Sequence, residues 1–338
     1  MINILDNFKN LELEIKNFKP DILVFCIDFD GTLTKIYKSP FDAVLENNYK
    51  KIIERIINIE NVFFCIVTGR EISDIIKIVS IDGNIIYSGN HGFEIKSFYK
   101  KIILDFIYDG LKNYLPVLKS IFDKASQIPI KNLIIENKKY SISLHYRILP
   151  HEDIKLLKDA VASIMDSNAG YKRMFELKKG KKIIEIRPKI QWNKGKACDF
   201  IVKELLAQLG YNSTYNSNKY SNKQLNTVKN SSSNVSSYNG MNAESKKEIK
   251  NILKICMGDD LTDETMFDRG DKYSLWFNPN SGLNSDLNSN LNSGLEKIHV
   301  KSINCIVGEK KSAADYYIHN FRQTYEVLEN IANCFVNL

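Results

Sequence analysis

The sequence predicts an α/β fold in which a doubly wound parallel sheet is interrupted by an inserted α+β module. Short apolar runs alternate with helix-spaced segments over the first ninety positions, which is the order of elements in a doubly wound sheet. Two apolar runs, at residues 22–27 and 252–257, have the character of buried parallel strands, and each leads directly into a cluster of aspartates. From about residue 98 the predicted strands alternate in side-chain character instead. A second, smaller unit is therefore expected.

The core elements follow in order along the first part of the chain. After the strand at 22–27, apolar residues at helical spacing, such as Ile52, Ile53 and Ile56, predict a helix within residues 41–59. The next elements are a strand at 62–67 that ends in Thr68-Gly69-Arg70, a helix at 71–79, and a strand at 84–87 that ends in Ser88-Gly89-Asn90-His91-Gly92.

An inserted module occupies the middle of the chain. Its predicted elements are a helix at 111–125, strands at 133–136 and 140–145, a helix at 152–165, and strands at 173–177 and 182–186. Because the module lies between the third core strand and a later core helix at 195–209, it is expected to form a lid or cap. The predicted domains are a first core part at 1–96, the cap at 97–190 and a second core part at 191–338.

Two segments of the second core part have the composition of disordered insertions. Of the 28 residues from 212 to 239, 16 are Asn or Ser, and residues 280–294 repeat Leu, Asn and Ser. Such segments bury too little apolar surface to offset the entropy of ordering, so disorder is predicted at about 212–242 and 280–294. Strands at 273–277 and 304–307 and a helix at 324–335 complete the core.

Composition limits the classes of protein to consider. The chain has 338 residues and a net charge of +7, but its basic residues are spread out, without an RNA-binding aromatic pattern or zinc-finger spacing. Nucleic acid is therefore not expected as a partner, and an anionic substrate suits the charge. No apolar run is long enough to span a bilayer, and the N-terminus does not resemble a signal peptide. Six cysteines without a paired spacing are typical of reduced thiols, which indicates a cytoplasmic protein.

The two aspartate clusters point to phosphoryl chemistry at the carboxyl ends of parallel strands. Asp28 is a competent nucleophile toward phosphorus, and Asp30, two residues on in an extended turn, is suited to act as acid and base. Carboxylates that converge with those of a second cluster, beginning at Asp259, repel one another unless a hard cation such as Mg²⁺ binds them. Thr68 supplies a hydroxyl group and Lys194 an ammonium group for a phosphate.

These motifs resemble, in order, the four motifs of the haloacid dehalogenase-like phosphatases: Asp28-Phe29-Asp30-Gly31-Thr32, Thr68-Gly69, Lys194, and Gly258-Asp259-Asp260-Leu261-Thr262-Asp263. The resemblance implies a Rossmann-like core with a mobile cap. The position of the cap between the second and third motifs is similar to the C2 (type IIB) arrangement.

Further segments look like those of trehalose-6-phosphate phosphatases. They are Gly89-Asn90-His91-Gly92-Phe93-Glu94-Ile95, Glu136-Asn137-Lys138, His145-Tyr146-Arg147, Glu185-Ile186-Arg187-Pro188 and Trp192-Asn193-Lys194-Gly195-Lys196-Ala197. This resemblance implies Mg²⁺-dependent hydrolysis of trehalose 6-phosphate to trehalose and phosphate through an aspartyl-phosphate. The alternatives are a phosphatase for another sugar phosphate, such as sucrose phosphate, and a non-catalytic sugar-phosphate-binding regulator of a synthase.

The resemblance also implies roles for individual residues. Asp28 is the implied nucleophile, Asp30 the acid and base, and Thr68 and Lys194 the residues that hold the transferring phosphate. The implied metal ligands are Asp28, Asp30 through its carbonyl, Asp259 and Asp263, while which of Asp259, Asp260 and Asp263 binds directly stays open. The substrate-binding residues are Gly69, Arg70, His91, Glu136, Lys138, Arg147, Lys181 and Glu185.

Several of these residues have a structural alternative. Arg70 either caps the following helix or reaches the phosphate, and His91 is either a hydrogen-bonded structural residue or a ligand contact. Glu136 and Arg147 bind sugar or form a cross-strand ion pair on the cap sheet. Lys181 binds sugar or belongs to a solvated, lysine-rich hairpin turn.

The remaining expectations concern partners and surface. A sugar phosphate is the expected small-molecule partner. Because no glycosyltransferase domain precedes the phosphatase motifs, coupling to a trehalose-phosphate synthase is expected in trans, and no membrane partner is expected. Asp21 and Asp74 are expected on the surface.

Overall fold

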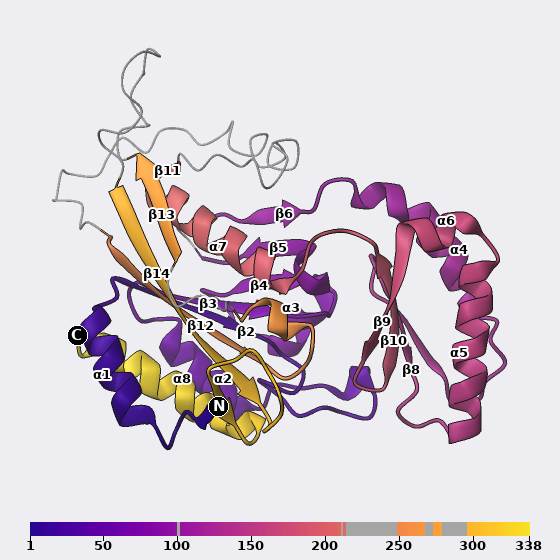
Figure 1. Ribbon diagram of the computed structural model, residues 1–338, viewed down its shortest axis with the longest axis horizontal. Coiled ribbons are helices and arrows are strands. Elements are labelled where there is room, and N and C mark those ends of the chain that lie inside the picture. Colours follow the sequence, from indigo (N-terminus) through magenta and orange to yellow (C-terminus); the bar gives the residue numbers. More distant parts are fainter. Residues whose placement is uncertain (100–101, 211, 214–248, 268–272, 279–295) are drawn as a thin grey trace, which may run out of the picture.

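The computed structural model describes residues 1–99, 102–210, 212–213, 249–267, 273–278 and 296–338. It has a large lobe built around an extended sheet and a smaller lobe beside it, built around a second sheet (Figure 1). The smaller lobe comes from the middle of the chain, as the inserted module predicts.

The large sheet has eleven strands within the described residues, in the order β1-β15-β14-β12-β2-β3-β4-β5-β6, with β13 and β11 added beside β14. Its parallel centre consists of β12 (Asn251–Gly258), β2 (Ile22–Ile27), β3 (Val62–Val67) and β4 (Ile86–Gly89). The outer strands are β1 (Ile2–Asn3), β5 (Glu94–Ser97), β6 (Asp105–Ile107), β11 (Asn212–Ser213), β13 (Tyr273–Asn278), β14 (Glu296–Val307) and β15 (Tyr316–Ile318). The doubly wound α/β prediction is confirmed.

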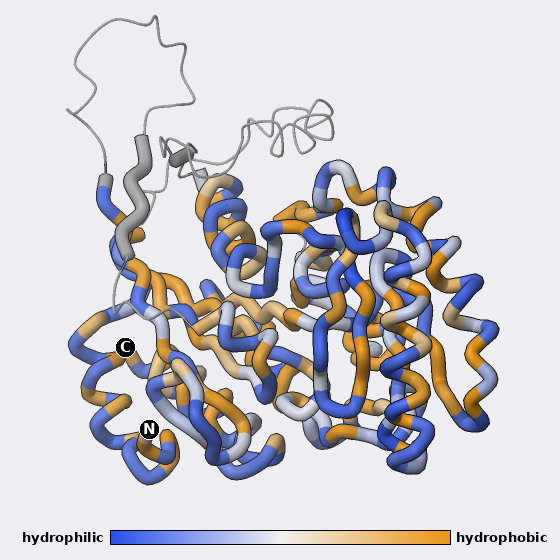
Figure 2. Tube along the Cα trace, turned by 45° about the vertical axis from the view of Figure 1, so that its right-hand side comes forward, coloured by the Kyte–Doolittle hydropathy of each residue, from blue (hydrophilic) through white to orange (hydrophobic). Residues whose placement is uncertain are grey.

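The central strands are buried on both faces, which is why the sequences of β2 and β3 are unbroken apolar runs. The other two central strands each include a buried polar residue, Ser88 in β4 and Lys254 in β12. In β2, Leu23 and Phe25 face one hydrophobic cluster, whereas Val24 and Cys26 face the other. The first cluster is covered by α1 (Phe8–Phe18), α2 (Asn47–Ile56), α3 (Ile72–Val79) and α8 (Phe321–Val336), and the second by α7 (Lys194–Gln208). Figure 1 shows α1, α2 and α8 together on one side of the sheet and α7 on the other, and hydrophobic residues lie along the strands between them (Figure 2).

The smaller lobe is an α+β cap with an antiparallel sheet in the order β7-β8-β10-β9. Its strands are β7 (Ile134–Asn137), β8 (Ile142–His145), β9 (Phe175–Gly180) and β10 (Ile183–Pro188), and its helices are α4 (Leu115–Ala125), α5 (His151–Asp166) and α6 (Ala169–Met174). Ile142 and Leu144 of β8 pack against Leu118 of α4 and Leu157 of α5. Because strand side chains alternate, the opposite face of this sheet carries polar residues such as Ser143 and Glu185.

Several boundaries differ from the sequence-based expectation: the strand expected at 304–307 begins at Glu296 as β14, and the strand expected at 84–87 is β4 at Ile86–Gly89. Two further differences have local reasons. The helix expected from residue 41 begins at Asn47, because Pro40 starts a short 3-10 turn, η1 (Pro40–Asp42), in which the Ser39 hydroxyl accepts the N–H of Phe41. The strand expected at 173–177 begins at Phe175, because Asn168 caps a preceding helix, α6, by accepting the N–H of Gly170.

The ends of the core also hold elements that were not predicted. The N-terminal strand β1 pairs with β15, and α1 follows it. Strand β6 pairs with β5 in the large sheet, so residues 105–107 lie in the core sheet although the sequence placed them in the cap. Residues 212–213 of the first predicted insertion form β11; the rest of that insertion up to residue 242 and the insertion at 280–294 lie outside the described residues.

Candidate active site

The parallel strands bring both aspartate clusters to one edge of the large sheet. Strands β2 and β12 are neighbours, with Ile27 opposite Met257, so that Asp28 and Asp259 follow adjacent strand ends. The N–H of Asp28 donates to the Met257 carbonyl at 2.9 Å, which extends the pairing past the end of β2. On the other side of β2, strand β3 ends immediately before Thr68.

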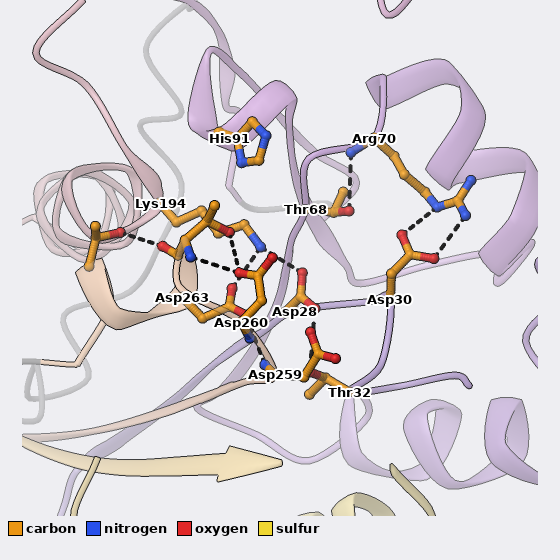
Figure 3. Close-up of polar contacts among 12 residues, drawn as sticks. Asp28, Asp30, Thr32, Thr68, Arg70, His91, Lys194, Asp259, Asp260 and Asp263 are labelled. Carbon is orange, nitrogen blue, oxygen red and sulfur yellow. Dashed lines mark hydrogen bonds and ion pairs between the residues drawn. The ribbon is translucent and has the colours of Figure 1, made fainter. Parts of the chain in front are cut away.

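Lys194 lies buried between two carboxylates of this edge. Its Nζ is 2.6 Å from Oδ1 of Asp28 and 2.7 Å from Oδ1 of Asp263 (Figure 3). The Thr32 hydroxyl donates to the other Asp28 oxygen at 3.3 Å. The nucleophile candidate is therefore held on both sides by groups that stabilise a negative oxygen.

Helix α7 carries Lys194 into the site because its N-terminus packs tightly against the second aspartate loop. Asn193 caps the helix by accepting the N–H of Lys196 at 2.9 Å. A side chain at Gly195 would lie 1.7 Å from the Thr265 carbonyl oxygen, so only glycine allows this approach. This close contact between Gly195 and Thr265 determines how far the side chain of Lys194 extends into the site.

Asp263 organises the second aspartate loop. Its Oδ2 accepts the N–H groups of Asp259 and Asp260 at 2.8 and 3.0 Å, and the residue is fully buried. Oδ1 of Asp260 accepts both the N–H and the hydroxyl of Thr262 at 2.7 Å. Gly31, with a φ of +94°, leaves room for this loop, since a side chain there would lie 1.9 Å from Oδ2 of Asp259.

Burial and crowding shift the ionisation of these groups. Burial raises the pKa of Asp28 well above its ordinary value, and repulsion from Asp263 adds to this effect against the attraction of Lys194. Burial likewise raises the pKa of Asp259 to about 6, although Lys181 opposes it. For Lys194, burial favours the neutral amine, but Asp263 and Asp28 outweigh it and raise its pKa well above the usual range. The carboxylates thus have more negative charge than the lysines neutralise.

The same carboxylates fit a divalent cation. One oxygen from each of Asp28, Asp259 and Asp263 lies within 4.8 Å of the other two. Clustered carboxylate oxygens are the ligands that Mg²⁺ prefers, and a cation among them would offset their mutual repulsion. Among the described residues, Asp260 lies outside this group of three carboxylates, and one of its oxygens is turned to Thr262.

Asp30 is turned toward Arg70 (Figure 3). Arg70 donates from Nε to Oδ2 of Asp30 at 2.7 Å and from Nη2 to Oδ1 at 2.8 Å. Its Nη1 donates to Asp74 at 2.9 Å and to the Pro40 carbonyl at 3.1 Å, while its backbone N–H donates to the Thr68 hydroxyl at 3.2 Å. The side chain of Arg70 is thereby bound to groups of the protein itself. From the sequence, a helix cap and a phosphate were the alternatives for Arg70, and neither Asp30 nor the Pro40 carbonyl was expected as its partner.

The cap faces this edge of the core across a cleft of about 130 Å³. The cleft is lined by Asp30, Arg70, Asp259, Asp260 and residues 36–40 from the core, and by Glu136, Lys138, His145, Arg147, Lys181 and Ile183 from the cap. Pockets for small molecules are typically roughly 300–1,000 Å³. In this arrangement of the lobes, the space between them is smaller than a typical pocket for a small molecule.

Cap residues reach across to the core at several points, one of which is the ion pair between Lys139 and Glu94 of β5. Lys181, in the turn between β9 and β10, forms an ion pair with Asp259. Glu185 of β10 lies with Oε2 3.0 Å from Nε2 of His91. His91 in turn lies over Gly69, where a side chain would be 2.7 Å from the imidazole ring. Gly69, His91 and Glu185 thus form a stack from the core into the cap.

The remaining cap residues hold one another in place. Oε2 of Glu136 is 2.8 Å from Nε2 of His145, and Nζ of Lys138 is 3.9 Å from both Glu136 and Glu185. Arg147 donates to the Lys181 carbonyl at 2.7 Å. Glu136 and Arg147 therefore contact His145, Lys138 and the Lys181 carbonyl. They do not form with each other the cross-strand ion pair that the sequence suggested as the structural alternative.

Sequence reasoning gave no role in the site to four residues that belong to this region, although His145 stands in one of the segments that carry the resemblance. Asp74, expected on the surface, binds Arg70, and Lys310 donates to the Asp259 carbonyl from a loop after β14. Ser141 donates to Glu185 at 3.1 Å, and His145 bonds Glu136. Alternation along β8 puts Ser141 and His145 on the polar face of the cap sheet and could have indicated both, whereas no local pattern indicates Lys310.

None of the helices in the described part of the chain is both long enough and apolar enough to cross a membrane.

Comparison with known proteins shows that the chain is similar to trehalose-phosphatases. Residues 26–228, more than half of the chain, match the trehalose-phosphatase family. A probable trehalose-phosphate phosphatase D of Arabidopsis thaliana is 30% identical over 194 residues, which are 54% of this chain and 50% of that protein. Trehalose 6-phosphate phosphatase RA3 of Zea mays is 28% identical over 194 residues, which are 54% of this chain and 52% of that protein. The chain spans about half the length of these curated relatives.

Solved structures show the same fold. The C-terminal domain of a trehalose-6-phosphate phosphatase from C. albicans aligns over 97% of both chains, with a TM-score of 0.61 and 21% identity. A trehalose-6-phosphate phosphatase related protein aligns over 93% of this chain and 99% of its own, with a TM-score of 0.58 and 19% identity.

Proposed function

The chain belongs to the trehalose-phosphatase family, and from this membership we propose that it hydrolyses trehalose 6-phosphate to trehalose and inorganic phosphate through an aspartyl-phosphate. The contact between Lys194 and Asp28, 2.6 Å long and buried at the strand edge below the cap, carries the proposal. An ammonium group there favours the ionised form of the carboxylate against the effect of burial and holds it in place, and it can also hold an oxygen of an incoming phosphate.

In the first proposed step, a carboxylate oxygen of Asp28 attacks the phosphorus atom, and the bond between phosphorus and the sugar oxygen breaks. Asp30 donates a proton to that leaving oxygen, because an alkoxide is a poor leaving group. Lys194 and the Thr68 hydroxyl stabilise the charge on the transferring phosphoryl oxygens. Trehalose leaves, and the phosphoryl group remains on Asp28.

In the second proposed step, Asp30 accepts a proton from water, whose oxygen attacks the phosphorus of the aspartyl-phosphate. The bond from phosphorus to Asp28 breaks, which releases inorganic phosphate and restores the Asp28 carboxylate. Asp30 is again protonated, as it was at the start, so that one water is consumed for each ester cleaved.

Mg²⁺ is part of the proposal, with Asp28, Asp259 and Asp263 as side-chain ligands and Asp30 contributing its carbonyl. When bound, such an ion supplies Lewis-acid stabilisation of charge on the phosphoryl oxygens. The spacing of the three carboxylates and the raised pKa values of Asp28 and Asp259 support its presence.

The polar face of the cap is the proposed sugar site. Its members are Glu136, Lys138, Arg147, Lys181 and Glu185, with Gly69 and His91 contributing from the core. Arg70, expected from the sequence to bind substrate, is not included, because its side chain is bound to Asp30, Asp74 and the Pro40 carbonyl. A sugar presents many hydroxyl groups, and a ligand that lacks one leaves a buried polar group unpaired, which gives steep discrimination. Closing of the cap over the ligand would exclude water from the phosphoryl intermediate.

A trehalose-phosphate synthase acting in trans is the proposed source of substrate, and a cytoplasmic location is proposed with it. In support of the location, all six cysteines are buried free thiols, the form that a reducing compartment maintains.

The test is a phosphate-release panel with trehalose 6-phosphate, sucrose 6-phosphate and glucose 6-phosphate, each with and without Mg²⁺. We expect Mg²⁺-dependent release that is fastest from trehalose 6-phosphate. A tenfold preference for another ester would make that ester the substrate in place of trehalose 6-phosphate. Tight binding of trehalose 6-phosphate without turnover would indicate a non-catalytic regulator.

A further inference from the structure

The guanidinium group of Arg70 is almost fully used within the protein. Nε and Nη2 bind the two oxygens of Asp30, and Nη1 binds both Asp74 and the Pro40 carbonyl. These contacts use four of the five N–H donors that an arginine carries. The Arg70 side chain is only 6% exposed, so little of it remains open to a phosphate in the cleft.

The paired contact fixes the orientation of the Asp30 carboxylate. Two parallel N–H···O bonds, at 2.7 and 2.8 Å, hold the carboxylate in the plane of the guanidinium and stop rotation about its last side-chain bond. Asp30 is 38% exposed and lines the cleft to the cap, so the free side of the same carboxylate faces the space for a sugar. Asp28 points instead toward Lys194 (Figure 3).

Three separate segments fix Arg70 in turn. Asp74 lies in the first turn of α3, Pro40 follows the loop after β2, and the Thr68 hydroxyl accepts the backbone N–H of Arg70 at the end of β3. A group that transfers a proton must be held to within about 0.5 Å of its productive position. A carboxylate on a flexible surface side chain does not meet this requirement, whereas one held by a fixed arginine can.

We propose that Arg70 is a positioning residue for Asp30, and that Asp74 keeps Arg70 in place for this task. The inference rests on the proposed function, since it concerns the proton that Asp30 gives to the sugar oxygen. It assigns Arg70 to the leaving-group side of the reaction rather than to phosphate binding.

A comparison of leaving groups separates these roles. A sugar alkoxide leaves only with a proton, whereas p-nitrophenolate leaves readily without one. A misplaced Asp30 therefore slows cleavage of the sugar ester selectively, but a lost phosphate contact or a distorted fold slows both. The ratio of kcat/KM for the two esters is the appropriate readout, because kcat/KM covers only the steps up to release of the leaving group.

The experiment measures this ratio, with Mg²⁺ present, for the full chain and for Arg70→Lys, which keeps the charge but cannot form the two-pronged contact. We expect kcat/KM for trehalose 6-phosphate to fall by about 100-fold, in the range of general-acid contributions, and that for p-nitrophenyl phosphate by less than about threefold. In an Asp30→Asn background, Arg70→Lys should leave the ratio unchanged. An equal fall for both esters, or an undiminished effect in that background, overturns the proposal.

Asp74→Ala provides a second, milder variant, because Asp74 is 42% exposed. It should lower the ratio about three- to tenfold, a fraction of the full general-acid effect. The matched control is Asp123→Ala, which removes the corresponding i,i+4 pair with Lys119 on the cap and should not change the ratio. An unchanged ratio in Asp74→Ala overturns the role of Asp74.

Phosphate release by the wild type from the panel of sugar phosphates shows whether a failure concerns the role of Arg70 or the proposed function. If another sugar phosphate is the better substrate, the assignment of trehalose 6-phosphate fails and the ratio is measured with that ester instead. If the wild type cleaves neither kind of ester, both proposals fail.

Discussion

Glu185 of the cap and His91 of the core meet across the boundary between the lobes, with 3.0 Å between Oε2 and Nε2. Burial opposes ionisation of Glu185, but His91, Lys138 and Arg187 together outweigh it and hold its pKa well below the usual range. The Ser141 hydroxyl donates to the same carboxylate. One charged group thus links the strand edge of the core to the polar face of the cap.

Glu185→Gln should lower the free energy of unfolding at pH 7 by about 1–3 kcal/mol, the usual worth of hydrogen bonds to a charged group. Because the folded-state pKa is depressed, the contribution is complete above the ordinary glutamate pKa of about 4.3 and is lost as the pH falls from there toward the folded value. Urea unfolding between pH 7 and pH 3 should therefore show wild type and variant converging on acidification. A gap that stays constant over this range contradicts the role of the charge; Glu12→Gln, in an exposed pair with Lys16, is the control and should change little.

Lys194→Met should destabilise the protein by about 3–5 kcal/mol when Mg²⁺ is absent, because it leaves Asp28 and Asp263 buried without their shared cation. Denaturant unfolding in a chelating buffer measures the loss. Lys196→Met, two residues along the same helix and more exposed, is the comparison and should have a much smaller effect. Equal unfolding midpoints for Lys194→Met and wild type would show that the buried charges are neutralised in another way.

Asp28→Asn should reduce phosphate release from trehalose 6-phosphate by at least about 10³-fold, as expected when a nucleophile is removed. The amide has nearly the shape of the carboxylate and can still accept from Lys194, so circular dichroism and the melting temperature should stay close to those of the wild type. Turnover within tenfold of the wild type, in a preparation free of other phosphatases, rules out the aspartyl-phosphate route.

Mg²⁺ should raise the melting temperature of the wild type, since a ligand at 100 times its dissociation constant adds about 2.7 kcal/mol of stability. Asp259→Asn and Asp263→Asn should abolish most of this rise. Asp260→Asn should retain most of it, because Asp260 lies outside the group of three carboxylates whose oxygens come together. Loss of the rise in Asp260→Asn together with its survival in Asp259→Asn would reassign the ligands.

Two strands of the parallel core could be predicted to the residue, whereas β4 is shifted by two residues from the expected 84–87 and β12 is one residue longer at each end than the expected 252–257. Residues 22–27 and 62–67 form β2 and β3 as expected, because these two strands, buried on both faces, have no polar positions and end abruptly at the site residues. Edge elements were harder to predict. Strand β6 has only three residues and α1 has a mixed polar surface, so their existence depends on packing against the sheet rather than on a local pattern.

Site residues carried by motifs were easier to find than residues that act through them. Asp28, Asp259 and Lys194 follow strand ends or begin a helix, where the topology alone brings them together. Asp74 looked like an ordinary surface acid on a helix, although it follows Arg70 by four residues and pairs with it. That Arg70 also binds Asp30 and the Pro40 carbonyl becomes visible only when the end of β3 is placed beside the loop after β2. Likewise, the partner of Lys310 is set by a strand order that brings β14 beside β12.

Helix α7 and strand β12 each have a site residue at the end nearer the cap: Lys194 begins the helix, and Asp259 follows the last residue of the strand. Their other ends, at Gln208 and Asn251, consequently lie roughly 20–25 Å away, a distance set by 15 helical and 8 extended residues. The Asn/Ser-rich stretch is attached to the core at those two ends. Because both points of attachment are far from Asp28, a reporter tag inserted between them should leave phosphate release unchanged.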